Sequence, residues 1–158
     1  MAVAESGTLH HTCFVVRDVE RAARALADKL GIGPWNLWTI EPAATTVHGR
    51  DVPFSFHVAL AQVGGSSYEL IAPHTGESVY VEHLETKGEG FHHTCLAYPS
   101  LAAMRAARAE LAAQGRTMIQ SGSLGDLGEF CYFEIAETGS ALELLYLKDL
   151  PPPEKTIG

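Results

Sequence analysis

The sequence contains the same four residues twice: His10–Cys13 and His92–Cys95 both read His-His-Thr-Cys, 82 positions apart. Each copy opens an apolar run of the kind that forms a buried strand, and each run leads into an alanine-rich amphipathic segment. The residues that precede these segments, Asp18 and Ser100, are separated by the same interval as the two copies. The repeat therefore predicts two equivalent modules with one fold.

Each module is predicted to contain a strand, a helix and three further strands, in the order β-α-β-β-β. Asp18 and Ser100 are expected to cap the two helices, and Gly31 and Gly115 to end them. A module of this size cannot bury a sheet face alone. We therefore expect an α+β fold in which the two modules form one curved mixed sheet around a metal-binding cleft.

The whole chain, residues 1–158, is expected to be a single domain, because its length suits one shared core. The predicted parts are module 1 at about 9–73, a linker at 74–90, module 2 at about 91–147 and an extended tail at 148–158, of which residues 151–158 are expected to be loosely held. Within module 1, residues 41–53 contain Pro, Gly and mixed polar residues and are predicted to be an irregular excursion.

Composition argues against several classes of partner. The net charge is −8 and no cluster of Lys or Arg offsets it, so we expect no nucleic acid and no membrane partner. No apolar run approaches the ~20 residues of a membrane span, and the N-terminus does not resemble a signal peptide. The three cysteines, Cys13, Cys95 and Cys131, lie in apolar stretches and are expected to be reduced thiols of a cytoplasmic protein.

The repeated strands and the last strands of the two modules carry residues that suit a metal site. Side chains alternate along a strand, so His11 and Cys13 share one face while His10 shares the other with Thr12. The last strands each place one Glu inside an apolar run, Glu69 and Glu143, which is costly unless the carboxylate is paired or binds a metal. Two His and two Glu would suit Fe, Co, Ni, Mn or Zn more than Mg or Ca.

At these positions the sequence resembles the vicinal oxygen chelate superfamily, which includes glyoxalases, bleomycin resistance proteins and extradiol dioxygenases. The strongest local match is Lys87–Cys95, which is similar to the start of the second half of methylmalonyl-CoA epimerases. In that family the metal ligand is the His seven residues before the helix-capping residue, which selects His11 and His93. His10 and His92 are then expected to point to the opposite face as structural residues.

The resemblance implies that Glu69 and Glu143 complete the ligand set, so the predicted metal site is His11, Glu69, His93 and Glu143. In epimerases the position of Glu69 is often Gln, and Glu is closer to the glyoxalase pattern. An approximate alignment places the catalytic base of the epimerases at His57. Glu69 or Glu143 could instead act as the base by leaving the metal.

The scarcity of basic residues and the aromatic side chains expected near the cleft favour an apolar or aromatic carbonyl compound as substrate. An acyl-CoA thioester would need contacts for its phosphates, and the only plausible ones are Arg50, Lys87 and Arg116. By resemblance alone, we also expect a homodimer.

The preferred interpretation is a metal-dependent isomerase or epimerase that abstracts a proton α to a carbonyl through a metal-stabilised enolate, similar to methylmalonyl-CoA epimerase. Three alternatives remain. An Fe(II)-dependent dioxygenase would use His11, His93 and Glu143 as a facial triad. A glyoxalase-type lyase is the second. A non-catalytic protein would bind an antibiotic or metabolite in the cleft without metal.

Overall fold

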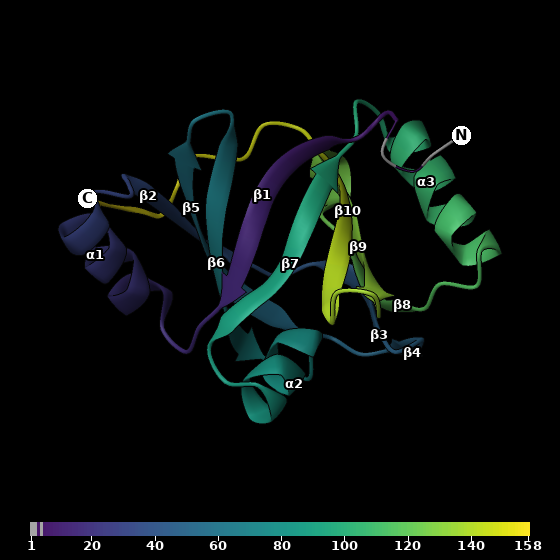
Figure 1. Cartoon of the computed structure of the whole chain (residues 1–158), viewed down its shortest axis with the longest axis horizontal. Helices are drawn as coiled ribbons and strands as arrows, with labels where there is room; N and C mark the ends of the chain where they lie inside the picture. Colours follow the sequence, from purple (N-terminus) through teal and green to yellow (C-terminus); the bar gives the residue numbers. More distant parts are fainter. Residues whose placement is uncertain (1–2, 4) are drawn as a thin grey trace.

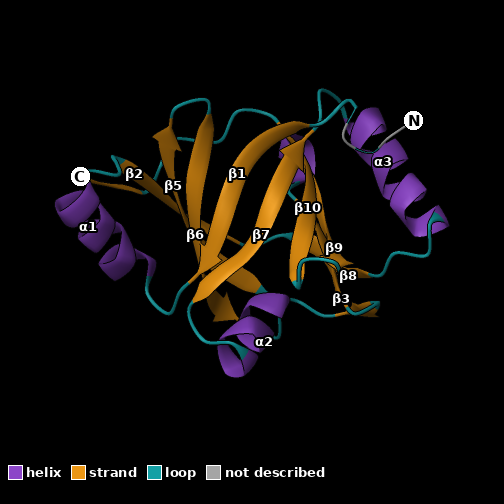
Figure 2. Ribbon diagram, in the orientation of Figure 1, coloured by secondary structure: helices purple, strands orange, loops and turns teal. Residues whose placement is uncertain are grey.

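The computed structural model describes residue 3 and residues 5–158. Its strands join into one mixed, curved sheet, with three α-helices placed around it (Figures 1 and 2). The elements are, in chain order, β1 (Thr8–Val15), α1 (Val19–Leu30), β2 (Trp35–Ile40), β3 (Ala43–Val47), β4 (Arg50–Asp51), β5 (Ser55–Val63), β6 (Ser66–Thr75), α2 (Val79–Thr86), β7 (Gly90–Ala97), α3 (Leu101–Ala113), β8 (Met118–Ser123), the 3-10 helix η1 (Gly125–Leu127), β9 (Gly128–Ile135), β10 (Ser140–Leu147) and β11 (Lys155–Ile157).

The sheet contains the two predicted modules side by side. Its strand order is β11-β2-β5-β6-β1-β7-β10-β9-β8-β3-β4. The repeated strands β1 and β7 lie antiparallel at its centre, and each pairs in parallel with the last strand of its own module, β6 or β10. Outward from these, β5 and β2 follow on one side and β9 and β8 on the other, and the sheet ends with β11 beside β2 and with β3 and β4 beside β8. The predicted fold of two β-α-β-β-β modules in one curved mixed sheet is confirmed.

The sheet curls until its two ends approach each other. Strand β2 is second from one end of the order and β3 is second from the other, yet only Glu41 and Pro42 separate them in the chain. The segment 41–53, predicted to be irregular, forms most of this closure and is instead a hairpin. His48 and Gly49 both have positive φ, 49° and 75°, which suits the tight turn between β3 and β4. Strand β3 of this hairpin pairs with β8, which is distant in sequence, so local composition could not reveal the pairing.

The two long helices begin and end as the sequence predicts. The Asp18 carboxylate accepts a hydrogen bond from the Arg21 N–H at 3.0 Å, and the Ser100 hydroxyl accepts one from Ala103 at 3.1 Å. Gly31 ends α1 with φ 67°. Helices α1 and α3 lie against the outer face of the sheet at its two sides, and α2 lies below its centre (Figure 2).

The apolar interior is divided into three parts. One cluster lies under α1 and another under α3, on the outer face of the sheet. The largest fills the inside of the curl, where side chains of α2 such as Tyr80 meet Phe56 and Phe130 from facing strands. The inside of the curl also holds the cleft expected from the sequence.

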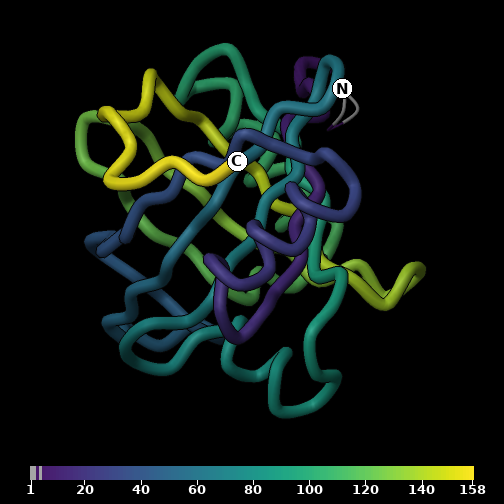
Figure 3. Tube along the Cα trace, turned by 90° about the vertical axis from the view of Figure 1, so that its left-hand side faces the viewer, coloured from purple at the N-terminus to yellow at the C-terminus, as the bar shows by residue number. Residues whose placement is uncertain are grey.

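The C-terminal segment is held more firmly than its composition suggests. Residues 155–157 form β11, which pairs antiparallel with β2 (Figures 1 and 3). Ile157 is only 5% exposed and packs into the cluster under α1, so the prediction of a loosely held tail is wrong at this point. The Trp38 indole N–H donates to the Pro151 carbonyl at 2.9 Å and holds the segment that precedes β11. Among the described helices, none combines the length and the apolar character that crossing a membrane requires.

Candidate metal centre

Two rows of cross-strand neighbours run over the centre of the sheet, and each contains one Glu, one Cys and one His. The rows are Glu69–Cys13–His93 on β6, β1 and β7, and His11–Cys95–Glu143 on β1, β7 and β10. Neighbours in a row face the same side of a sheet. The register of the repeated strands therefore brings both histidines and both glutamates to the inside of the curl.

The four side chains converge on one point. The Nε2 atoms of His11 and His93 lie 2.9 and 3.0 Å from Oε2 of Glu143. The same two nitrogens lie 3.2 and 3.7 Å from Oε1 of Glu69, and 3.3 Å from each other. One ligand atom from each residue lies within 4.8 Å of the other three. All four residues that the sequence singled out are brought together.

The electrostatics of the cluster suit a cation. All four side chains are buried, and Oε1 of Glu69 has no hydrogen-bond partner. Burial raises the pKa of Glu143, but hydrogen bonds from His11 and His93 outweigh this and lower it. Burial lowers the pKa of His11, but Glu69, Cys95 and Glu143 raise it well above its ordinary value. An unpartnered buried carboxylate oxygen beside two imidazoles is the donor set of a transition-metal site, so the residues fit the divalent ion.

Three members of the cluster, His11, Glu69 and Glu143, line a small, mostly apolar chamber of about 60 Å³. Its walls come from strands of both modules, among them Phe56, Val58 and Leu145, with Leu124 and Leu150 from the segments around η1 and after β10. An outer chamber of about 470 Å³ adjoins it and includes polar side chains such as Asn36 and Gln62. The two chambers share four lining residues, His10, Leu60, Leu147 and Leu150, which places the outer chamber at the entrance to the inner one.

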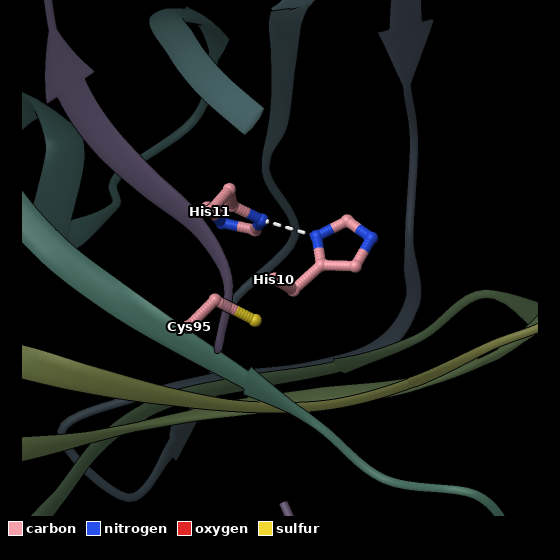
Figure 4. A group of neighbouring side chains, drawn as sticks. All are labelled: His10, His11 and Cys95. Atoms are coloured by element: carbon pink, nitrogen blue, oxygen red, sulfur yellow. Dashed lines mark hydrogen bonds between the residues drawn. The ribbon is translucent and has the colours of Figure 1, made fainter. Parts of the chain in front are cut away.

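His10 does not lie where strand alternation predicted. The pairing of β1 with β7 is irregular between Leu9 and His11, so the alternation is interrupted at this residue. The ring of His10 lines both chambers, and its Nδ1 lies 2.8 Å from Nδ1 of His11 (Figure 4). Cys95, which is fully buried, lies beside this pair.

His92 makes the same contact in the second module but lies elsewhere. Its Nδ1 is 2.7 Å from Nδ1 of His93. Its ring packs at 5.2 Å from His83, which is 8% exposed, and at 5.8 Å from Tyr80. Burial and the neighbouring His93 lower the pKa of His92 to about 2, so its ring is neutral. This surrounding agrees with the structural role predicted for His92.

His57 is not part of the site. It lies on β5 between Phe56 and Val58, and those two neighbours face the inner chamber. The His57 ring points to the other face, where its Nδ1 lies 3.0 Å from the Thr39 hydroxyl and its ring 4.4 Å from that of His74. Adjacent residues of a strand point to opposite faces, so His57 faces away from the chamber that Phe56 and Val58 line. The geometry therefore does not support His57 as the catalytic base.

A pair of buried tyrosines adjoins the cluster, and the sequence did not reveal the pair. The hydroxyls of Tyr80 and Tyr132 lie 2.7 Å apart, and the Tyr132 ring lies 4.7 Å from that of His93. Burial raises the pKa of both phenols well above the ordinary value. Tyr80 comes from the linker helix, so no local signal connected it with the repeated strands.

Comparison with known proteins agrees with this architecture. The family model described as the glyoxalase/bleomycin resistance protein/dioxygenase superfamily matches residues 10–133. No protein with a curated description matches the chain.

Solved structures share the fold at low sequence identity. Methylmalonyl-CoA epimerase from Mycobacterium tuberculosis has a TM-score of 0.61 and 19% identity, over 89% of this chain and 88% of that one. The hypothetical protein BH1468 from Bacillus halodurans C-125 has the same score and identity, over 93% of this chain and 99% of that one. An epimerase in complex with methylmalonyl-CoA and NH4+ has a TM-score of 0.59 and 15% identity, over 94% of this chain and 100% of that one. The chain belongs to the glyoxalase/bleomycin resistance protein/dioxygenase superfamily.

Proposed function

We propose that this protein is a metal-dependent isomerase or epimerase of the methylmalonyl-CoA epimerase type, which removes and returns a proton α to a carbonyl group. The observation that carries this proposal is the convergence of two His and two Glu at one point, where three of them line a small, mostly apolar chamber. His11, His93 and Glu143 would hold a divalent ion. The ion would act as a Lewis acid that stabilises the negative charge developing on the carbonyl oxygen.

Glu69 is the carboxylate best placed to act as the base. Its Oε1 lies 3.2 and 3.7 Å from the two histidine nitrogens, whereas Oε2 of Glu143 lies 2.9 and 3.0 Å from them. The same Glu69 oxygen has no hydrogen-bond partner. The less engaged carboxylate is therefore the one that can take a proton from a carbon held above the cluster.

The apolar walls of the inner chamber serve this chemistry by excluding water. Water would compete for the proton and would screen the charges that the site depends on. A chamber of about 60 Å³ also favours a compact reacting group. We propose that the acyl or carbonyl end of the substrate occupies this chamber and that the rest extends into the outer one.

The structure bears on how a CoA group would be held. Arg50 and Arg116 form ion pairs with Glu77 and Glu137, and the Lys87 ammonium donates to the Gly139 carbonyl. None of these three cations lines either chamber, whereas Lys148 lines the outer one, next to Asp149. Structures of similar fold include an epimerase from Streptomyces coelicolor in complex with 2-nitronate-propionyl-CoA. For this chain, Lys148 would be the contact for a phosphate.

The test combines metal analysis with proton exchange. We expect about one equivalent of a divalent transition metal in the purified protein. The metal-loaded protein is then incubated in D₂O with a panel of 2-substituted acids, ketones and acyl-CoA thioesters, including methylmalonyl-CoA. Mass spectrometry should detect deuterium at the α-carbon of at least one compound. Absence of exchange across the thioesters would exclude the methylmalonyl-CoA epimerase type, and absence of metal would overturn the proposal as a whole.

One observation favours a second candidate. The longer contacts of Glu69 leave His11, His93 and Glu143 as the closely associated set, and two histidines with one carboxylate are the ligands of Fe(II)-dependent oxygenases. A dioxygenase would consume O₂ with a phenolic or carbonyl substrate when loaded with Fe²⁺. Oxygen uptake without deuterium exchange would select it over the isomerase.

A further inference from the structure

Each proposed histidine ligand is preceded by a second histidine that contacts its far nitrogen. His11 and His93 direct their Nε2 atoms at the carboxylate cluster. Their Nδ1 atoms lie 2.8 and 2.7 Å from the Nδ1 atoms of His10 and His92. The repeated His-His dipeptide therefore produces the same ring-to-ring hydrogen bond in both modules.

The direction of these hydrogen bonds follows from the number of protons on each ring. A neutral imidazole that binds a metal through Nε2 carries its hydrogen on Nδ1. The Nδ1–H of His11 then donates to Nδ1 of His10, which must hold a lone pair. A neutral His10 ring with a lone pair on Nδ1 carries its hydrogen on Nε2. The same reasoning places a hydrogen on Nε2 of His92.

The two Nε2–H groups end in different surroundings. His92 is buried beside His83 and Tyr80, in a part of the molecule that does not line either chamber of the site. His10 lines both chambers, and its Nδ1 contacts His11 of the cluster. Figure 4 shows its ring extending away from His11, with Nδ1 toward that residue and Nε2 on the far side.

We propose that His10 is a substrate-binding residue whose Nε2–H donates a hydrogen bond to an oxygen of the ligand held over the cluster. Through Nδ1 it also positions His11. His92 performs only the positioning role, for His93. This inference rests on the proposed metal site, and it makes two residues with the same local contact functionally different.

Two substitutions at each position separate the roles. The side-chain amide of Asn lies near the place of Nδ1 in histidine, so His10→Asn keeps the acceptor for His11 and removes the Nε2–H. The longer Gln places its amide near Nε2, so His10→Gln keeps a donor toward the chamber and removes the acceptor. His92→Asn and His92→Gln are the matched controls. Circular dichroism and thermal unfolding of the metal-free proteins would show that each variant folds.

The first measurement is the dissociation constant of Co²⁺, followed by its visible absorption. We expect His10→Gln and His92→Gln to bind Co²⁺ about 10-fold or more weakly, because the ligand histidines lose the partner that orients them. His10→Asn and His92→Asn should stay within about 3-fold of the wild type, since the acceptor is retained.

The second measurement is the binding of acetohydroxamate, a small chelator with two adjacent oxygens, to the Co²⁺-loaded proteins. His10→Asn should bind it about 10-fold more weakly than wild type, the cost of one lost hydrogen bond, while His92→Asn should not differ. Equal affinity in wild type and His10→Asn would overturn the inference and leave the proposed function intact. A thiolate-to-cobalt absorption band that disappears in Cys95→Ser would also overturn it, because His10, His11 and Cys95 would then be ligands of the ion. A wild-type protein that binds no Co²⁺ would overturn the proposed function itself.

Discussion

The two halves of the candidate site have the same residues in the same register but differ in what surrounds them. Oε2 of Glu143, in the second module, lies within 3.0 Å of the Nε2 atoms of both His11 and His93. In the row of Glu69, the carboxylate lies farther from both and keeps an oxygen without a partner. The repeat therefore gives the two carboxylates equivalent positions on the sheet, but it does not give them equal distances to the two histidines.

The sharpest test of this difference is to remove the charge of each carboxylate in turn. Glu69→Gln should lower the rate of α-proton exchange by about 10²- to 10⁴-fold, the usual contribution of a general base. Its metal content should be close to that of the wild type. The measurement is deuterium wash-in by mass spectrometry, with metal content determined on the same sample. A Glu69→Gln protein that exchanges at the wild-type rate would assign the base to another group.

The Glu-to-Gln substitution at Glu143, in the second module, should instead lower the affinity for the metal. Glu143→Gln is expected to weaken divalent metal binding by more than about 100-fold, because it removes the carboxylate closest to both histidines. Losing a ligand should weaken binding more than losing a residue that only orients a ligand. Competition with a chromogenic chelator would measure this. If Glu69→Gln and Glu143→Gln lowered metal affinity equally, the two carboxylates would be equivalent ligands, and the difference in their distances to the histidines would have no effect on metal binding.

The two ends of the sheet offer a second comparison. One end is completed by β11 on β2, and the other by the β3–β4 hairpin on β8. Ile157→Ala should lower the free energy of unfolding by about 2 kcal/mol, since the buried side chain leaves a cavity under α1. Thr156→Ala is the comparison and should cost less, because its exposed side chain loses only the hydrogen bond that its hydroxyl donates to Asn36. Urea unfolding of both variants measures the effect, and equal stability would mean that the C-terminal segment contributes nothing to the closed end.

The smallest expected effect is on the pH dependence of metal binding. Glu69, Cys95 and Glu143 raise the pKa of His11 well above its ordinary value, so the ring keeps its proton to higher pH than a free imidazole and metal binding must displace that proton. Metal affinity should therefore rise by up to about 10-fold per pH unit as the pH increases toward the raised pKa, and then level off. Chelator competition at several pH values would show this slope. A flat profile would mean that His11 is already deprotonated at neutral pH.

Much of the site could be predicted from the sequence because its residues lie on strands that alternate and repeat. His11 and His93 share an interval with the helix caps, and Glu69 and Glu143 stand out as carboxylates inside apolar runs. These are local signals. The role predicted for His57 rested on an approximate alignment, and the structure places its ring on the face of β5 opposite to the chamber. His10 was misplaced because an irregularity in pairing is invisible in a single strand.

The sequence by itself determined the two modules with their shared β-α-β-β-β order and singled out the His and Glu residues that converge, since periodicity, caps and turn residues act over short distances. Only the tertiary structure decided how the sheet closes, because β3 pairs with β8 and β11 with β2 across long stretches of chain. It also decided which residues line the chambers above the cluster. The two identical His-His pairs differ there, because the ring of His92 is buried against α2 whereas the ring of His10 lines both chambers of the site.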